Sequence, residues 1–479
     1  MKICAIICEY NPLHYGHLYH IEKARELSGC DAIMCIQAGN FTQRGEPAIA
    51  NKYVRASMAL EAGADIVVQI PTAYCCSSAE IFALAGVKIA NSFENVTHLA
   101  FGCETENYEL LKEIAKYFAN EPKEFKEKLA KFLDEGNSLP VSRQKAIEEL
   151  IKEDKVDFSE ITETLNILTK PNNILAIEYM KAIYKTKSKI EPIFTTRSNS
   201  DYNSADLNGK DSSATAIRTR LISKNKIKSI KKLIPSFTYD LLKEDMEKYG
   251  LPDINLYNDL CSYVIKTSTA DEIKNVYDVS EGIQNRFLDS AKKFKDFNEL
   301  LLDVKTKRYT YTRLKRITLR LLLKINKDIV GQIYKMDKLP FIKVLAFNAH
   351  NKDLLSSVSA DTNIIIRNSN VVKSPTTAYT ELANIEDRAN AVYNMLLRKT
   401  KEIPNFAPDL YTQTIKYDKK NKKKQLPWKE VIFYAPINFF IFSICFYVST
   451  SPKYTHFSIF FEENIICLQP VRSGAISTS

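Results

Sequence analysis

Four short apolar runs alternate with helix-like stretches over the first hundred residues, and this alternation constrains the fold more than any other feature of the chain. The runs have the length and apolar content of buried strands, and the third is closed by Pro71. They cover 2–8, 31–41, 65–71 and 96–104, and helices are expected between them at 18–29, 51–64 and 78–93. Strands joined through helices by short connections predict an α/β fold with an open parallel sheet and right-handed crossovers.

After residue 104 the pattern becomes mainly helical. A Lys/Glu-rich stretch at about 108–165 carries no strand signal and is predicted to be a helical insertion. A strand at 191–200 and a helix at 212–224 then complete a first domain over 1–230. The amphipathic stretches that follow predict a mainly helical second domain over 231–410, with a buried strand or hairpin at 339–350 packed against it.

Residues 411–479 differ in character from the rest of the chain. The run KYDKKNKKK at 416–424 is predicted to be a solvated basic linker, and 431–448 is an almost wholly apolar tail. That tail approaches the minimum length of a membrane span, but Pro436 and Asn438 interrupt it. A membrane anchor therefore competes with a hydrophobic tail or an altered reading frame. We favour the latter two and expect no membrane partner.

Charge and cysteine spacing narrow the class of protein. The 479 residues carry a formal net charge of +10, which permits an RNA or phosphate-rich partner without requiring one. The ten cysteines include no C-x-x-C pair, and no secretory signal is visible. We expect reduced, buried thiols in a cytoplasmic protein.

Three of the six histidines lie within residues 9–20, EYNPLHYGHLYH, where the first strand turns into the first helix. The pattern His14-x-Gly16-His17 places two imidazoles at a helix N-terminus, whose free N–H groups and dipole favour phosphate. The carboxyl end of a parallel strand is also where α/β sheets bind ligands. A zinc site and a purely structural cluster are the alternatives. Since no pattern supplies a fourth zinc ligand, we favour a nucleotide site.

A second motif, SSATAIR at 212–218, begins a predicted helix after a strand. Ser213 and Thr215 supply hydroxyls and Arg218 a cation, although the hydroxyls could simply cap the helix. Together the two motifs resemble the paired signature of the H-x-G-H nucleotidyltransferase superfamily, except that Ala214 replaces a serine. The resemblance implies a Rossmann-like domain in which both motifs hold a triphosphate during attack on its α-phosphate.

Seven blocks make the resemblance more specific. In chain order they are EYNPLHYGHLYHIEKARE, GNFTQRGEPAIANKYVRASMAL, PNNILAIEY, SSATAIR, EGIQNRF, KTKRYTYTRLKR and IKVLAFN. They resemble the bacterial tRNA(Met) cytidine acetate ligase family. This implies a ligase that forms acetyl-adenylate from acetate and ATP and acetylates the wobble cytidine of elongator tRNA(Met) to N4-acetylcytidine. It also implies ATP as a substrate with Mg2+, no tightly bound cofactor and no resident metal.

The same resemblance implies the residues of the ATP site, with His14 and His17 as the catalytic pair. The first segment of the site comprises Ile7, Cys8, Glu9, Tyr10, Asn11, Pro12, Leu13, His14, Tyr15, Gly16, His17, Leu18, Tyr19 and His20. The remaining members are Gly102, Asn172 (preferred to Asn173), Arg197, Ser213 and Thr215. The alternatives are a strand-end turn for Gly102, a helix cap for Asn172 and a surface strand residue for Arg197.

The segment KTKRYTYTRLKR at 305–316 interleaves cations with Tyr309 and Tyr311. Cations can contact phosphates while tyrosine rings stack on unpaired bases, so this segment is a candidate tRNA interface. Its proposed contacts are Lys305, Lys307, Arg308 and Arg313. An ordinary basic helix face is the alternative. Two rival functions also stay open: a small-molecule adenylyltransferase of cofactor biosynthesis and a non-catalytic RNA-binding protein.

Overall fold

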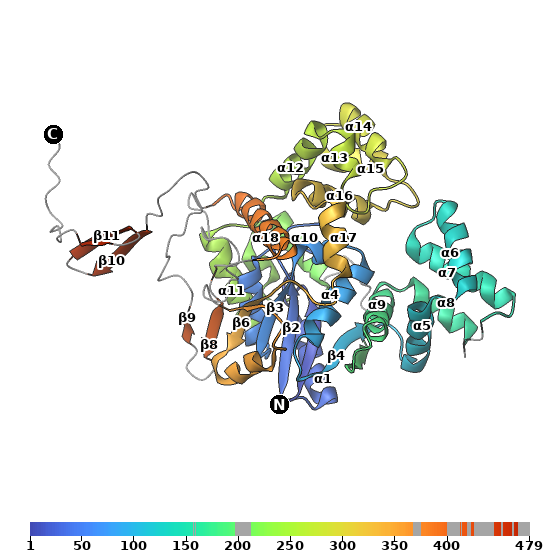
Figure 1. Cartoon of the computed structure of the whole chain (residues 1–479), viewed down its shortest axis with the longest axis horizontal. Helices are drawn as coiled ribbons and strands as arrows, with labels where there is room; N and C mark the ends of the chain where they lie inside the picture. The colour runs from blue at the N-terminus through green and yellow to red at the C-terminus, as the bar shows by residue number, and fades with distance from the viewer. Residues whose placement is uncertain are drawn as a thin grey trace.

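The computed structural model describes residues 1–156, 158, 160–196, 212–366, 375–399, 412 and 414–417. It also describes the backbone of residues 418, 423–425, 445–451, 454–461 and 464–467. Figure 1 shows a central sheet flanked by helices, with two helical lobes beside it. One lobe is formed by α5 to α8 and the other by α12 to α16.

The central sheet begins with five parallel strands in the order β5-β4-β1-β2-β3, which confirms the predicted parallel α/β fold. These strands are β1 (Ile3–Cys8), β2 (Ala32–Ala38), β3 (Ile66–Ile70), β4 (Val96–Cys103) and β5 (Glu191–Thr196). The chain moves outward from β1 through β2 and β3, and then returns to the other side of β1 as β4. The boundary between β1 and β4 is therefore the point where the strand order reverses, and ligands bind above such points in α/β sheets.

Both faces of this sheet are buried, as expected for a parallel sheet covered by helices. Along β1, Ile3 and Ala5 belong to one apolar core, whereas Cys4 and Ile6 belong to the other. The helices of this part are α1 (Tyr15–Ser28), α2 (Lys52–Glu61), α3 (Thr72–Cys75), α4 (Ala79–Asn91), α9 (Pro171–Lys185) and α10 (Ala214–Lys224). Helix α4 packs so closely on β1 that a β-carbon at Gly86 would collide with the Ile7 side chain.

The predicted helical insertion corresponds to four helices, which extend slightly beyond the expected range. They are α5 (Tyr108–Asn120), α6 (Lys123–Asp134), α7 (Leu139–Lys152) and α8 (Ile161–Thr169). Their buried side chains, such as Phe118 and Phe125 of α5 and α6, join the core that covers one face of the sheet.

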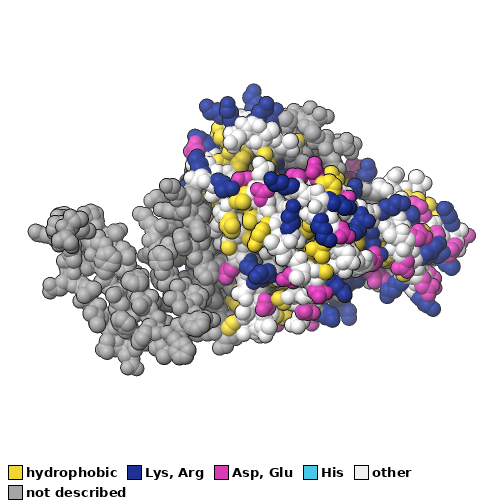
Figure 2. All heavy atoms as spheres, turned by 90° about the horizontal axis from the view of Figure 1, so that it is seen from above, with side chains coloured by type: hydrophobic (Ala, Val, Ile, Leu, Met, Phe, Trp, Pro, Cys, Tyr) yellow, Lys and Arg dark blue, Asp and Glu magenta, His cyan; other side chains and the backbone are white. Residues whose placement is uncertain are grey.

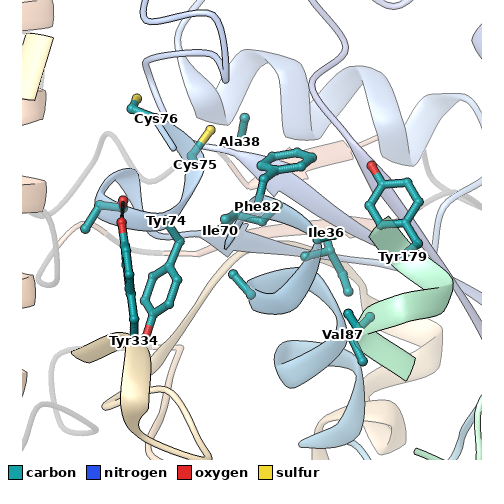
Figure 3. Close-up of a cluster of buried hydrophobic side chains, with 14 of the residues drawn as sticks. Ile36, Ala38, Ile70, Tyr74, Cys75, Cys76, Phe82, Val87, Tyr179 and Tyr334 are labelled. Atoms are coloured by element: carbon teal, nitrogen blue, oxygen red, sulfur yellow. Dashed lines mark hydrogen bonds between the residues drawn. The ribbon is translucent and has the colours of Figure 1, made fainter. Parts of the chain in front are cut away.

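The second half of the chain is mainly helical, and part of it returns to the sheet. Its helical elements are η2 (Ile227–Ile230), α11 (Ser236–Lys248), α12 (Ile254–Thr267), α13 (Ala270–Lys274), α14 (Ile283–Lys293), α15 (Phe297–Val304), α16 (Tyr311–Leu322), α17 (Lys327–Lys335), η3 (Ala349–Ser357) and α18 (Thr377–Met395). Figure 3 shows Tyr334 of α17 beside Tyr74 of α3, with ring centroids 4.9 Å apart. Tyr334 also donates a hydrogen bond of 2.6 Å to the carbonyl oxygen of Ala73, so α17 is fixed to the sheet domain.

The segment 339–350 is predicted to be a buried strand or hairpin packed against the helical domain. Phe341 does lie against Tyr379 of α18, with ring centroids 4.9 Å apart, but the strand itself belongs to the central sheet. The segment forms β6 (Ile342–Asn348), which pairs antiparallel with β3 and extends the central sheet. The strand is almost fully buried, as predicted, but its partner lies far back in the sequence. The two-residue strand β7 (Ile364–Ile365) pairs with β6.

The predicted solvated linker at 416–424 also differs from the structure. Residues Ile415–Asp418 form β8 beside β6, and Lys423–Gln425 form β9 beside β8. Ile415 and Tyr417 are buried, whereas Lys416 between them is exposed, so the segment alternates like a half-buried strand.

The apolar stretch at 431–448 lies largely outside the described residues. Its last residues belong to β10 (Cys445–Ser451), which forms a separate antiparallel sheet with β11 (Tyr454–Phe461) and β12 (Asn464–Cys467). No helix in the described ranges is long and apolar enough to cross a membrane.

Candidate active site

A cavity of about 380 Å³ lies above the carboxyl ends of β1 and β4, where the strand order reverses. Its walls come from the two predicted motifs and from β4, β5 and α9. The structure thus brings together residues that are more than 200 positions apart. The predicted ATP-site residues that line it are Ile7, Cys8, Glu9, Tyr10, Asn11, His14, Gly16, His17, Tyr19, His20, Gly102, Asn172, Ser213 and Thr215.

Four predicted ATP-site residues do not line this cavity: Pro12, Leu13, Tyr15 and Leu18. Leu13 is fully buried in the core beneath the site, and Leu18 packs against that core. The apolar side chains of Leu13 and Leu18 therefore anchor the turn and the helix, and neighbouring residues line the cavity. Arg197 lies outside the described residues.

His14 and His17 organise the N-terminus of α1 between them. Nδ1 of His14 accepts a hydrogen bond from the backbone N–H of Gly16 at 3.1 Å, and Nδ1 of His17 accepts one from the backbone N–H of His14 at 3.3 Å. In a neutral imidazole whose Nδ1 accepts, the ring proton sits on Nε2. Each ring can therefore donate an N–H from Nε2 to a phosphate oxygen in the cavity.

The second motif supplies another helix N-terminus to the same cavity. Ser213 caps α10, its hydroxyl accepting from the backbone N–H of Ala216 at 3.2 Å. Arg218 donates to the carbonyl oxygen of Asn11 at 2.8 Å and to the hydroxyl of Thr215 at 3.2 Å. Because it bonds to both motifs, Arg218 fixes the two helix N-termini relative to each other. Such N-termini suit an anion with several phosphates.

The opposite wall contains Gly102 at the end of β4 and Asn172 at the start of α9. Asn172 donates from Nδ2 to the Glu104 carboxylate at 2.9 Å and faces the cavity. Asn173 is 1% exposed and accepts from the backbone N–H of Glu104 at 2.7 Å. The two neighbouring asparagines therefore differ in position, and of the two it is Asn172 that lines the cavity.

A loop that the sequence analysis left unassigned also lines the cavity. It contributes Thr42, Gln43, Arg44 and Glu46. The Glu9 carboxylate accepts from the backbone N–H of Gln43 at 2.7 Å and so ties the loop to the end of β1. Arg44 brings a cation to the wall. In the sequence, only the block GNFTQRGEPAIANKYVRASMAL, quoted for its resemblance, includes this loop.

The helical domain holds the same loop from outside. Lys315 of α16 pairs with Glu46 at 2.6 Å, and the Tyr257 hydroxyl donates to the Gly45 carbonyl at 2.6 Å. Gly45 has a φ of +75°, and a β-carbon there would lie 2.9 Å from the backbone nitrogen of Arg316. Glycine is required here both for its backbone conformation and for this close approach.

Arg55 is a buried cation that fixes the strand ends beneath the cavity, and the sequence analysis did not find it. It is 0% exposed and donates to the carbonyl oxygens of Ala50, Glu9 and Gly39. Burial lowers the pKa of its guanidinium. The three carbonyl oxygens compensate for part of that desolvation.

The geometry argues against the metal alternative for the histidine cluster. The rings of His14 and His17 stack with centroids 3.8 Å apart, and both Nδ1 atoms accept backbone hydrogen bonds. Among the residues that the structure describes, no group of three or more His, Cys, Asp or Glu side chains is arranged to hold a metal ion.

Comparison with known proteins agrees with this geometry. The family described as HIGH Nucleotidyl Transferase matches the chain over residues 1–405. A tRNA(Met) cytidine acetate ligase of Caldicellulosiruptor saccharolyticus is 38% identical over 440 residues, covering 91% of this chain and 99% of the relative. The chain belongs to the tRNA(Met) cytidine acetate ligase family. A ligase of the same name from Clostridium novyi is 39% identical over 368 residues, covering 76% of this chain and 89% of the relative.

Two solved structures of Thermotoga maritima TmcAL are also similar to this member of the tRNA(Met) cytidine acetate ligase family. The apo structure has a TM-score of 0.79 at 27% identity and covers 85% of this chain and 99% of its own. The structure bound with alpha-thio ATP has a TM-score of 0.76 at 27% identity and covers 85% of this chain and 97% of its own.

In this family member, only part of the candidate tRNA interface is exposed for contact with RNA. Arg313 donates to the Asp278 carboxylate at 2.7 Å and lies over the Tyr309 ring. Arg308 pairs with Glu281 and donates to the carbonyl oxygen of Leu133. Both arginines are thus engaged within the protein.

The stacking role suggested for Tyr309 is wrong. This ring is 2% exposed, and its hydroxyl donates to the carbonyl oxygen of Ser280 at 2.9 Å. Tyr311 is half-buried and donates to Asn298 at 2.7 Å. By contrast, Lys305 and Lys307 are exposed.

Proposed function

We propose that the protein is an ATP-dependent acetate ligase that acetylates the exocyclic amine of the wobble cytidine of elongator tRNA(Met). The observation that carries this proposal is the convergence of two helix N-termini, with His14, His17 and the Arg218 bridge, on one cavity at the reversal of strand order. The relatives named tRNA(Met) cytidine acetate ligase and the neighbour bound with alpha-thio ATP support it.

In the first step a carboxylate oxygen of acetate attacks the α-phosphorus of ATP, and pyrophosphate leaves. The new acyl–phosphate bond gives acetyl-adenylate. The Nε2–H groups of His14 and His17 donate to phosphate oxygens on which charge develops, and the N-termini of α1 and α10 hold the triphosphate. ATP enters with Mg2+, whose preferred ligands are the phosphate oxygens, water and carboxylates.

In the second step the N4 amine of cytidine attacks the acetyl carbonyl carbon, and AMP leaves. The amine loses a proton, and no covalent bond to the enzyme forms in either step. The protein therefore acts by positioning the reactants and stabilising charge. Burial raises the pKa of the Cys8 thiol at the cavity wall, which makes it a poor nucleophile and fits this route.

For RNA binding, the exposed lysines Lys305 and Lys307 are proposed to contact phosphates. Arg308 and Arg313 are proposed to contribute to tRNA binding while they keep their ion pairs with Glu281 and Asp278. The protein is proposed to act in the cytoplasm. The helical domain is also connected to the ATP site, because Lys315 of α16 pairs with Glu46 in the wall of the cavity.

The proposal is tested by omitting one component at a time from ATP, acetate and tRNA(Met). Pyrophosphate should form from ATP only when acetate is present, and AMP should accumulate in turnover only when tRNA is added. A cofactor adenylyltransferase would instead form a dinucleotide without tRNA. A non-catalytic RNA-binding protein would release no pyrophosphate and would bind RNA equally well after His17→Ala.

A further inference from the structure

Residues 212–232, SSATAIRTRLISKNKIKSIKK, contain seven Lys and Arg and no acidic residue. On the face that Figure 2 shows, cationic and acidic side chains are mixed over much of the described surface. On the lobe of α5 to α8, for example, dark blue and magenta side chains lie next to one another (Figure 2). A stretch of one sign that starts at the reaction cavity therefore stands out.

The cations of this stretch follow the surface away from the cavity. Helix α10 begins at the cavity with Ser213 and Thr215 in its wall. At 1.5 Å per residue, its 11 residues extend about 16 Å to Lys224. Arg220 and Lys224 are both exposed and lie one turn apart on the same face of the helix.

Beyond α10 the chain forms one wall of a second cavity of about 740 Å³. The cations lining this cavity are Lys226, Lys228, Lys243, Arg398 and Lys399. Its two acidic residues already have cationic partners. Glu247 lies 3.7 Å from Lys243, and Asp253 lies 3.2 Å from Arg398. The remaining charge of the cavity is therefore positive.

We propose that the exposed cations of this stretch form a binding surface for the phosphate backbone of the tRNA that is acetylated. We call this surface the basic stripe; its members are Arg220, Lys224, Lys226, Lys228, Lys231 and Lys232. The inference rests on the proposed function. A reacting cytidine must enter the cavity, so the backbone on one side of it must leave along the protein surface. Cations carried by a helix that begins at the cavity, and by the chain that follows it, suit that path.

The state of the other candidate interface supports this assignment. Arg308 and Arg313 are held by Glu281 and Asp278, which leaves Lys305 and Lys307 as its exposed cations. Phosphate neutralisation dominates affinity for nucleic acids. An anionic membrane would meet the same charges, but nothing in that alternative explains why the stripe begins on α10, the helix whose N-terminus lines the reaction cavity.

The test uses the full chain and a fluorescently labelled tRNA(Met). The stripe variant combines Arg220→Gln, Lys224→Gln and Lys226→Gln. The matched control combines Lys116→Gln, Lys123→Gln and Lys126→Gln, which removes the same charge from exposed positions of α5 and α6. Anisotropy gives the Kd between about 50 and 200 mM KCl, and thermal unfolding shows that both variants are folded.

The stripe variant should bind tRNA at least tenfold more weakly than the control. The slope of log K against log salt should also fall by about 2 to 3, since each lost phosphate contact removes about 0.7 to 0.9. Unchanged affinity and slope would overturn the proposal. So would a variant that loses binding to phosphatidylglycerol vesicles but keeps tRNA binding. If the slope falls as expected while the wild type forms no acetylcytidine, the stripe stands and the proposed function fails.

Discussion

The imidazole rings of His14 and His17 stack at 3.8 Å, and each Nδ1 accepts a backbone hydrogen bond from the turn that carries the pair. This reciprocal arrangement is a capping box in which histidines replace the usual hydroxyl and carboxylate. One pair of side chains thus fixes the helix N-terminus and also lines the cavity. We propose that the chemistry depends on the same two residues that cap the helix, and separate substitutions can distinguish these roles.

The variant His17→Ala should lower acetyl-adenylate formation far more than ATP binding. Removing one donor to a developing negative charge costs about 10²–10³ in rate, whereas ATP keeps its contacts with the two helix N-termini. Pyrophosphate release measures the rate, and equilibrium dialysis measures ATP affinity. Equal losses in both would make His17 a binding residue only.

The variants His14→Ser and His14→Ala should differ in stability but not in activity. Serine caps helices well, whereas alanine costs about 1 kcal/mol at an N-cap. His14→Ser should therefore unfold at higher denaturant than His14→Ala, while both lose the imidazole donor and its catalysis. Restoration of activity by serine would contradict a chemical role for this ring.

The adjacent asparagines should have different mutant phenotypes. Asn172→Ala should mainly raise the KM for ATP, because Asn172 lines the cavity. Asn173→Ala leaves the partly buried backbone N–H of Glu104 without this acceptor, which costs about 1–3 kcal/mol of stability. Urea unfolding and steady-state kinetics on both variants would show the split. The reverse pattern would reassign the ATP contact to Asn173.

Gly45→Ala should be more destabilising than Gly136→Ala. Both glycines have a positive φ, at +75° and +81°, so both substitutions carry the same kind of backbone strain. A β-carbon at Gly45 also meets the α16 backbone, whereas one at Gly136 meets nothing within 4 Å. The difference in unfolding free energy should be about 1–3 kcal/mol. Equal losses would mean that the loop and α16 are not held together.

Asp245 should make the protein less stable as the pH rises from about 4 to about 7. Burial raises the pKa of its carboxyl to about 7, well above the value of about 3.9 in an unfolded chain. The folded state therefore binds the proton more tightly across this window, and its advantage is lost as the pH rises through it. Asp245→Asn should remove this dependence, whereas Asp240→Asn, at an exposed position of the same helix, should retain it. Denaturant midpoints at pH 4 and pH 8 test this, and parallel behaviour of wild type and Asp245→Asn would contradict it.

Local sequence patterns predicted those strands and turns whose neighbouring elements in the fold are also close in the sequence. The apolar runs of β1 to β4 and the His14-x-Gly16-His17 turn are of this kind, because strand, turn and helix signals follow one another directly. Strand β6 was found but misplaced, since its partner β3 lies hundreds of residues earlier. The two-residue alternation of Ile415 and Tyr417 was hidden beside a lysine run.

The candidate site shows the same limit. His17 and Ser213 could be recognised from their own motifs, but Arg44 and Arg55 have no local signature of their role. Arg55 matters because three carbonyl groups from different strand ends and loops converge on it. Tyr309 looked like a stacking platform because nothing local in the sequence shows that its ring is buried or that its hydroxyl bonds to Ser280, which lies 29 residues earlier.

The central claim is that the cavity activates acetate for transfer to a tRNA base. The most direct test is nucleoside analysis of tRNA(Met) after incubation with the purified protein, ATP and labelled acetate. The account predicts labelled N4-acetylcytidine at the wobble position, dependent on ATP and abolished by His17→Ala. Unlabelled wobble cytidine in tRNA recovered from a reaction that consumes ATP and acetate would contradict it.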